Sequence, residues 1–177
     1  MNYSEEYKAL QVRFHQERPD YGVSGGRWSE SVKKLAAKLN TRDILDYACG
    51  KQTLQKGLPF PITNYDPFVP GYDTHPERPH GLVVCTDTLE HIEPDCLDAV
   101  LDDLRDLTGL AIFMTVATGP AKKFLPDGRN AHLIQENTTW WLYKLLPRFD
   151  VQSLQTMAGE FALVALPKEV SDESKVG

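Results

Sequence analysis

The sequence has 177 residues, 41% of them hydrophobic and 25% charged, with a formal net charge of -6. These values fit one globular domain with a full core and disfavour tight, non-specific binding to nucleic acid, and no apolar run approaches the roughly 20 residues of a membrane span. The polar, acidic N-terminus is not a secretory signal, and three cysteines without CxxC spacing favour a reducing cytoplasm and argue against a zinc site.

The N-terminal part of the chain predicts two helices joined by a loop. Residues 3–17 and residues 28–39 each place apolar side chains at steps of three and four. The first helix could pack on the core or act as a lid over a ligand. The loop 18–26 contains Pro and three Gly, and it could fold over a cofactor or serve as a plain connector.

Short apolar runs predict the strands of a sheet. The first four cover residues 43–47, 62–66, 82–85 and 110–116. Two further runs, 149–156 and 160–167, flank a tight turn and predict a hairpin. The sequence therefore predicts strands throughout the chain after residue 42.

Helices and two long loops separate these strands. About two helical turns fit after residue 51, and longer helices are predicted over 94–108 and 137–147. The loops 66–81 and 119–135 show no helical or strand period. Loops of this length in a compact domain are usually functional or mobile.

The alternation of strand and helix, closed by a hairpin, predicts an α/β fold with a doubly wound, mostly parallel sheet and an antiparallel edge. We expect residues 1–167 to form a single domain that begins with the helices in 3–39. The charged tail 168–177 is expected to be disordered. The sequence shows neither an internal repeat nor a second domain.

Two acidic residues mark the ends of neighbouring predicted strands. Asp46 is followed by a turn of small residues that includes Gly50, and Asp66 ends the next strand. Ligands of α/β sheets bind outside the carboxyl ends of parallel strands. The pair therefore predicts a site for an adenosine-bearing ligand.

At four places taken together the chain resembles the class I S-adenosylmethionine-dependent methyltransferases, over roughly residues 20–167. They are the acidic residue and turn of 45–51 (LDYACGK), Asp66, the stretch 83–92 (VVCTDTLEHI), whose LEH is similar to small-molecule and ubiquinone-type members, and 130–134 (NAHLI). The resemblance implies a Rossmann-like, seven-stranded type of sheet, or a reduced form of it, with a reversed last strand. It also implies S-adenosylmethionine as the cofactor.

The resemblance further implies cofactor contacts at the strand ends. Asp46 would hold the ligand's ammonium, and Asp66 would accept hydrogen bonds from both ribose hydroxyls. Either acid could instead have only a capping or turn role. Gly50 and Ala48 would let backbone N–H groups approach the methionyl end, on condition that Ala48 keeps a negative φ. The expected cofactor-binding residues are Asp46, Tyr47, Ala48, Cys49, Gly50, Asp66, Pro67, Cys85 and Thr86.

Methyl transfer from a sulfonium is an in-line displacement, and it needs a base only where the nucleophile must lose a proton. His132 is the first candidate for a base or substrate contact. Asp87 and His91 are further catalytic candidates, and Glu90 is the remaining titratable residue of this stretch. Each could instead be a structural residue that hydrogen-bonds or orients a loop, and the cations of loop 119–135 could bind an anionic acceptor or be solvated.

Two departures from the family pattern leave alternatives open. Ala48 and Gln52 stand where the family usually has Gly, and loop 66–81 lacks the strand and acid that commonly hold the adenine. A non-catalytic binding protein of the same fold is therefore one alternative. A nicotinamide site is disfavoured because the GxGxxG fingerprint finds only one Gly here.

The acceptor is expected to be a small molecule. The sequence lacks both the Asn/Asp-Pro-Pro-Tyr/Phe motif of amino-methylating nucleic-acid enzymes and a Pro-Cys nucleophile. A nucleotide or nucleic-acid acceptor, bound by the Lys and Arg of loop 119–135, is the alternative. We expect a cytoplasmic enzyme with no metal and no membrane partner, and the sequence does not indicate its oligomeric state.

Overall fold

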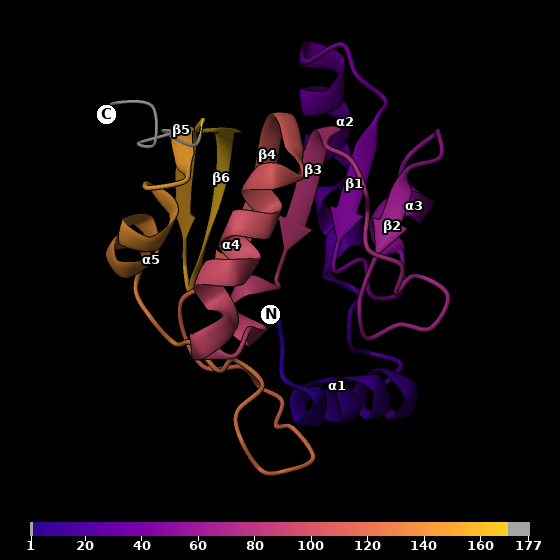
Figure 1. Cartoon of the computed structure of the whole chain (residues 1–177), viewed down its shortest axis with the longest axis vertical. Helices are drawn as coiled ribbons and strands as arrows, with labels where there is room; N and C mark the ends of the chain where they lie inside the picture. The colour runs from indigo at the N-terminus through magenta and orange to yellow at the C-terminus, as the bar shows by residue number, and fades with distance from the viewer. Residues whose placement is uncertain (1, 170–177) are drawn as a thin grey trace, which may run out of the picture.

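The structure, a computed structural model, describes residues 2–169 and has three layers around a central sheet (Figure 1). Helices α4 (Leu97–Asp106) and α5 (Thr138–Leu145) cover one face of the sheet. Helices α2 (Ser29–Lys38) and α3 (Thr53–Gly57) cover the other. The N-terminal helix α1 (Glu5–Glu17) instead lies across the end of the sheet toward which the first three strands point.

The sheet has six strands in the order β2-β1-β3-β4-β6-β5. β1 pairs in parallel with β2 and β3, and β3 with β4, whereas β6 runs antiparallel to both β4 and β5. The predicted mostly parallel sheet with a C-terminal antiparallel hairpin is confirmed, in a reduced form because loop 66–81 adds no strand. The strands are β1 (Ile44–Tyr47), β2 (Thr63–Tyr65), β3 (His80–Thr86), β4 (Thr108–Ala117), β5 (Phe149–Met157) and β6 (Glu160–Pro167).

The predicted helices form, but two of them begin with a short 3-10 turn. η1 (Ser24–Trp28) leads into α2, and η3 (Pro94–Cys96) leads into α4. A further turn, η2 (Leu89–His91), follows β3. Most of the predicted tail 168–177 lies outside the described residues, so its disorder stays a prediction.

Both faces of the parallel strands are buried, which explains why they read as continuous apolar runs. On one face Leu45 and Val83 pack with α4 and α5. On the other, Ile44 and Leu82 pack with α2 and α3. Trp141 of α5 is fully buried and belongs to the core on the first of these faces.

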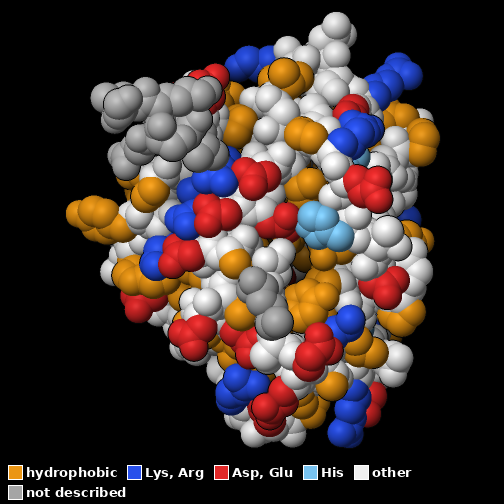
Figure 2. Space-filling model, in the orientation of Figure 1, with side chains coloured by type: hydrophobic (Ala, Val, Ile, Leu, Met, Phe, Trp, Pro, Cys, Tyr) orange, Lys and Arg blue, Asp and Glu red, His pale blue; other side chains and the backbone are white. Residues whose placement is uncertain are grey.

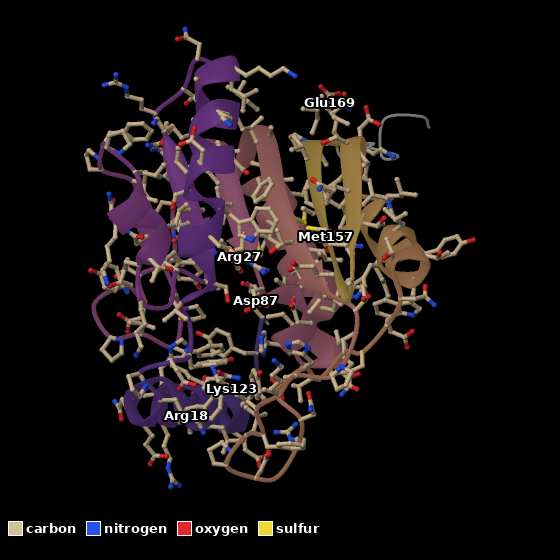
Figure 3. All side chains as sticks on the ribbon, turned by 180° about the vertical axis from the view of Figure 1, so that it is seen from behind. Arg18, Arg27, Asp87, Lys123, Met157 and Glu169 are labelled. Carbon is tan, nitrogen blue, oxygen red and sulfur yellow. The ribbon has the colours of Figure 1, made fainter. Side chains whose placement is uncertain are left out.

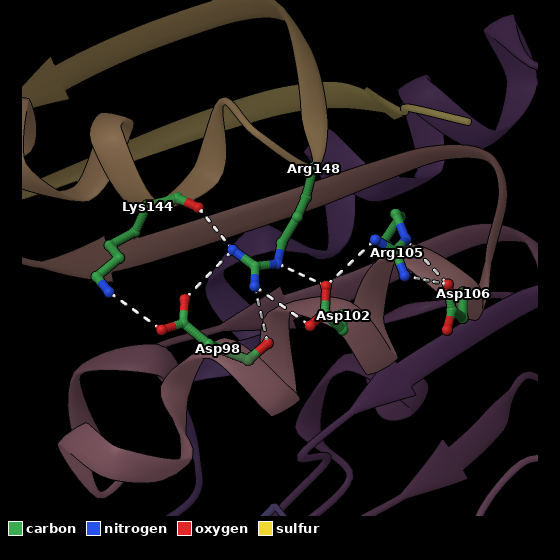
Figure 4. Close-up of polar contacts among 6 residues, drawn as sticks. All are labelled: Asp98, Asp102, Arg105, Asp106, Lys144 and Arg148. Atoms are coloured by element: carbon green, nitrogen blue, oxygen red, sulfur yellow. Dashed lines mark hydrogen bonds and ion pairs between the residues drawn. The ribbon is translucent and has the colours of Figure 1, made fainter. Parts of the chain in front are cut away.

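An ion-pair network fastens α4 to the segment that leads into β5 (Figure 4). The Arg148 Nε donates to Asp102 at 2.8 Å, and its Nη1 lies 3.3 Å from an Asp98 oxygen. The Lys144 ammonium pairs with Asp98 at 3.2 Å. Exposed ion pairs contribute little singly, so this network mainly fixes orientation.

The surface over α4 and α5 mixes Lys and Arg with Asp and Glu rather than gathering one sign (Figure 2). Such a face offers no extended basic track for a phosphate backbone. Across residues 2–169, no helix is both long enough and apolar enough to cross a bilayer.

We expect Leu101→Ala to lower the free energy of unfolding by about 2–5 kcal/mol. Leu101 lies on the face of α4 that packs on the sheet and is fully buried, so the substitution leaves a cavity. Leu110→Ala is the matched control, since Leu110 is 49% exposed, and it should change stability by less than about 0.5 kcal/mol. Urea unfolding measures both. Equal losses in the two variants would contradict the described core.

Candidate functional site

A cavity of about 400 Å³ opens at the carboxyl ends of β1, β2 and β3. Its volume is typical of small-molecule sites, and its place follows the rule for α/β sheets. Figure 3 shows Asp87 between the strand ends and α1, with Lys123 close to α1. The walls come from strand-end residues 46–50, 65–68 and 86–88, from loop residues 20–25 and 120–123, and from Tyr7, Gln11 and His15 of α1.

All but one of the residues predicted for the site line this cavity. The exception is Cys85, which is fully buried in the core beside Val83. Alternation along β3 turns both side chains toward α4 and α5, so the expected cofactor contact of Cys85 receives no support from its position. The predicted residues that do line the cavity are Asp46, Tyr47, Ala48, Cys49, Gly50, Asp66, Pro67, Thr86, Asp87, His91 and His132.

The turn after β1 alternates in and out of the left-handed backbone region. Ala48, Gly50 and Gln52 have φ values of 62°, 50° and 52°. The condition under which Ala48 would be a mild replacement for glycine, a negative φ, is therefore not met. A non-glycine residue in this region costs about 1–2 kcal/mol, so surrounding contacts must hold the turn in place.

Gly22 supplies the main contact that holds this turn. A Cβ added at Gly50 would lie 2.4 Å from the Gly22 carbonyl oxygen and 2.7 Å from its Cα. The N–H of Lys51 donates to the same carbonyl at 2.7 Å. The close approach at Gly50 is thus to the protein's own backbone, and the loop 18–26 is anchored on the site.

Asp46 is 3% exposed and lines the cavity. Within residues 2–169 no hydrogen bond reaches its carboxyl group. Burial, together with the charge of the nearby Asp66, raises the pKa of Asp46 to about 8. A buried carboxyl group of this kind favours a cationic partner, which would offset the cost of ionising it.

Asp66 is held by two backbone N–H groups. Gly50 donates to its Oδ2 at 3.0 Å and Phe68 to its Oδ1 at 2.9 Å. Burial raises the pKa of Asp66, and these bonds oppose that shift. Each oxygen keeps one further accepting position, so the carboxylate can still take two hydroxyl donors from a ligand.

Helix α1 is tied to the site by a chain of side-chain hydrogen bonds. The Tyr21 hydroxyl donates to Gln11 at 3.2 Å, and the Gln11 amide donates to the Tyr7 hydroxyl. The Tyr7 hydroxyl in turn donates to the backbone carbonyl of His91. Tyr7 and Phe14 of the same helix are also buried in a hydrophobic cluster with Leu125 and Ala131. Both roles weighed for this helix, packing on the core and covering a cavity, are therefore supported by its contacts.

Four titratable side chains meet at the other end of the cavity. Asp87, Glu90, His91 and His132 each offer a ligand atom, and these atoms all lie within 4.8 Å of one another. The rings of His91 and His132 are 4.8 Å apart, edge to face. Burial lowers the pKa of His91 to about 4 and raises the pKa of Glu90 well above its ordinary range.

The cations of loop 119–135 are largely paired within the chain. Lys123 donates to the Asp20 carbonyl at 2.6 Å and pairs with its carboxylate at 3.2 Å. The Arg129 Nη2 lies 2.6 Å from Asp127. Lys122 lines the cavity. The loop therefore offers less free positive charge than its sequence indicates.

Two residues of the site were not predicted as members of it. Ser24 donates a hydrogen bond to Asp87, and Tyr21 lines the cavity. The only sequence signal for them was the Pro and Gly content of loop 18–26. Their contacts join segments far apart in the chain, which local patterns do not indicate.

Comparison with solved structures finds the same fold in several methyltransferases. A structure of DhpI with S-adenosylhomocysteine (SAH) matches with a TM-score of 0.64 and 16% identity, over 94% of this chain and 100% of that one. The Burkholderia thailandensis 1,6-didemethyltoxoflavin-N1-methyltransferase matches at 0.60 and 16%, over 96% and 92%. An Escherichia coli rRNA methylase matches at 0.52 and 13%, over 93% and 77%.

No protein-family model matches the sequence, and no curated protein matches it. At these identities the structural likeness shows the fold alone. The chain therefore has the fold of the class I methyltransferases, as its sequence pattern led us to expect.

We expect Gly50→Ala to destabilise the protein more than Gly71→Ala does. Both residues have positive φ, which costs alanine about 1–2 kcal/mol. Only at Gly50 would the new Cβ also overlap backbone, that of Gly22, whereas nothing lies within 4 Å at Gly71. Urea unfolding gives the two free energies. Equal losses would contradict the described contact between Gly22 and Gly50.

We expect Asp46→Asn to stabilise the ligand-free protein, increasingly so as the pH rises. The ordinary pKa of Asp is about 4, and in the folded protein it is raised to about 8. The folded state thus holds an extra proton between these values, and its stability falls as the pH rises through that window. Asn does not titrate and has no such loss. The difference in the free energy of unfolding between Asp46→Asn and the wild type should therefore be larger at pH 9 than at pH 4 by at least about 1.4 kcal/mol.

Thermal unfolding from pH 4 to pH 9 measures this gain. Asp95→Asn, at an exposed position, is the control and should run parallel to the wild type. A pH-independent effect of Asp46→Asn would mean that Asp46 does not carry the raised pKa.

Proposed function

We propose that this chain, which has the fold of the class I methyltransferases, is an S-adenosylmethionine-dependent methyltransferase that acts on a small-molecule acceptor. The fold places a cavity of suitable size where such proteins bind their ligands. The solved neighbours bound to SAH include DhpI and the B. thailandensis enzyme. We propose that this chain binds the same kind of ligand.

Asp46 is the observation that carries the proposal. Its carboxyl group is buried, lines the cavity and has no hydrogen bond from the described residues. The methionyl ammonium of S-adenosylmethionine is a cation that would satisfy it. Since a charge-assisted hydrogen bond is about twice as strong as a neutral one, this contact would both orient the cofactor and favour ionised Asp46.

Asp66 and the turn after β1 complete the proposed cofactor site. Asp66 has one free accepting position on each oxygen, which suits the two ribose hydroxyls. The backbone at Ala48 and Cys49 lines the cavity beside it. Although Ala48 and Gln52 replace the family's glycines, the left-handed backbone they adopt keeps the shape of the turn.

We place the methyl acceptor at the end of the cavity formed by Asp87, His91 and His132. The transfer itself requires the acceptor atom, the methyl carbon and the sulfur to lie in line, which is a matter of positioning. His132 and Asp87 are the residues we expect to line the position of the acceptor atom.

A small-molecule acceptor fits better than a polynucleotide. Lys123 and Arg129 pair with Asp20 and Asp127, and the face over α4 and α5 carries both signs of charge. Phosphate recognition needs free Lys and Arg. A cytoplasmic location belongs to the same proposal, in keeping with three free cysteines.

We expect SAH to bind the wild type and to bind Asp46→Asn roughly 10- to 100-fold more weakly, because a hydrogen bond to a charged group contributes about 1.5–3 kcal/mol. Isothermal titration calorimetry at pH 8 measures both affinities, with Asp95→Asn as the control. The variant is expected to be the more stable protein, so weaker binding cannot be ascribed to unfolding. Equal affinities, or no binding of SAH to the wild type, would contradict the proposal.

A further inference from the structure

We propose that Asp87, Glu90, His91 and His132 form a binding site for a divalent transition-metal ion, and that this ion holds an oxygen atom of the methyl acceptor. The second half of this proposal rests on the proposed function. The metal site itself stands on the geometry of the four side chains.

The four side chains converge although they come from separate segments. Asp87 follows β3, Glu90 and His91 belong to η2, and His132 lies in the loop 119–135. One ligand atom from each falls within a group whose members are all within 4.8 Å of one another. A cation near the middle of this group would contact all four after small side-chain movements.

Backbone carbonyl groups determine which ring nitrogen of each histidine carries the proton. The His91 Nδ1 lies 2.7 Å from the Ala131 carbonyl oxygen, and the His132 Nδ1 lies 2.6 Å from the Gly119 carbonyl oxygen. Since a carbonyl oxygen only accepts, each Nδ1 carries the proton and each Nε2 keeps its lone pair. Metal-bound histidines show this arrangement, in which the second ring nitrogen donates to a backbone carbonyl or carboxylate.

Glu90 provides an independent indication of a ligand. It is fully buried, its Oε1 accepts from the Ala117 N–H at 2.8 Å, and its Oε2 receives no hydrogen bond from an N–H or hydroxyl donor of the described structure. The side chain close to it is the carboxyl group of Asp87, so Glu90 can bond to it only while one of the two holds a proton. Ionising both of these adjacent carboxyl groups, one of them fully buried, is costly. A bound cation would remove that cost.

The donor set indicates which ions fit. Two imidazole nitrogens and two carboxylates suit Mn²⁺, Fe²⁺, Co²⁺ or Zn²⁺ better than Mg²⁺ or Ca²⁺, which prefer oxygen ligands alone. Asp87, His91 and His132 line the cavity, whereas Glu90 lies behind them. The remaining coordination positions would therefore face the space assigned to the acceptor.

This placement favours an acceptor that is methylated on a hydroxyl oxygen. A hydroxyl bound to a divalent ion loses its proton to water more readily, because the ion lowers its pKa. The resulting oxygen attacks the methyl carbon, the C–O bond forms as the S–C bond breaks, and the bonding pair moves to the sulfur to leave SAH. No separate general base is then required, and His132 acts as a ligand rather than a base.

Co²⁺ titration of the full, untagged chain after treatment with EDTA tests the site, followed by visible absorption and calorimetry. We expect one equivalent of Co²⁺ to bind and to give a visible absorption band that the free ion lacks, because nitrogen and oxygen side chains replace water around it. Glu90→Gln and His132→Ala should each weaken binding at least about tenfold. His75→Ala is the control, because His75 is half exposed and pairs with Asp103 away from the cavity.

SAH binding, measured on the same samples, separates this proposal from the proposed function. If Co²⁺ does not bind, the proposed metal site is wrong. The same holds if His75→Ala weakens Co²⁺ binding as much as His132→Ala does. Either result counts against the metal site whether or not SAH binds. Specific Co²⁺ binding in a chain that does not bind SAH keeps the metal site and overturns the cofactor assignment. Retained SAH binding in Glu90→Gln shows that this variant is folded.

Discussion

Two parallel strands that end side by side force two buried acids, Asp46 and Asp66, into one cavity, and much of the site follows from this constraint. Burial disfavours the ionised form of both, and the charge of Asp66 adds to this effect at Asp46. Gly50 and Phe68 satisfy Asp66 through their backbone N–H groups. The strained turn that aims the Gly50 N–H is held by Gly22, so the loop after α1 is needed for the acids at the strand ends. Of the two acids, only Asp46 receives no hydrogen bond from the described residues, which leaves it for a cationic group of a ligand.

The opposite end of the cavity also brings acids together, the buried Glu90 and the half-buried Asp87, with two histidines beside them. Helix α1 covers the space between these two ends, and its hydrogen-bonded chain from Tyr21 to the His91 carbonyl connects them. Burial of the acids strengthens the charge interactions that they make. In the proposed function the two ends have different tasks. Asp46 pairs with the ammonium of the cofactor and orients it, and the cluster around Glu90 holds the methyl acceptor.

Most of the fold could be predicted because periodicity and chain order determine it. The apolar steps of three and four in α2 and α4, and the rule that parallel strands end at one edge, were enough to bring Asp46 and Asp66 together. Tertiary contacts decided the rest. Ala48 adopts a positive φ because its turn is held by Gly22, and Cys85 faces the core because both faces of β3 are buried. The meeting of Glu90 with His132 depends on a loop without any period, so the sequence indicated each residue but not the cluster.

The most direct test of the account is the number of protons released when SAH binds. With the pKa of Asp46 at about 8 in the ligand-free protein, most molecules carry its proton at pH 7. If the ligand's ammonium takes the place of that proton, calorimetry in buffers of different ionisation enthalpy will show close to one proton released per ligand bound at pH 7. Asp46→Asn will show close to none. Binding to the wild type without proton release, or the same release in both proteins, would contradict the assignment of Asp46 as the cation partner.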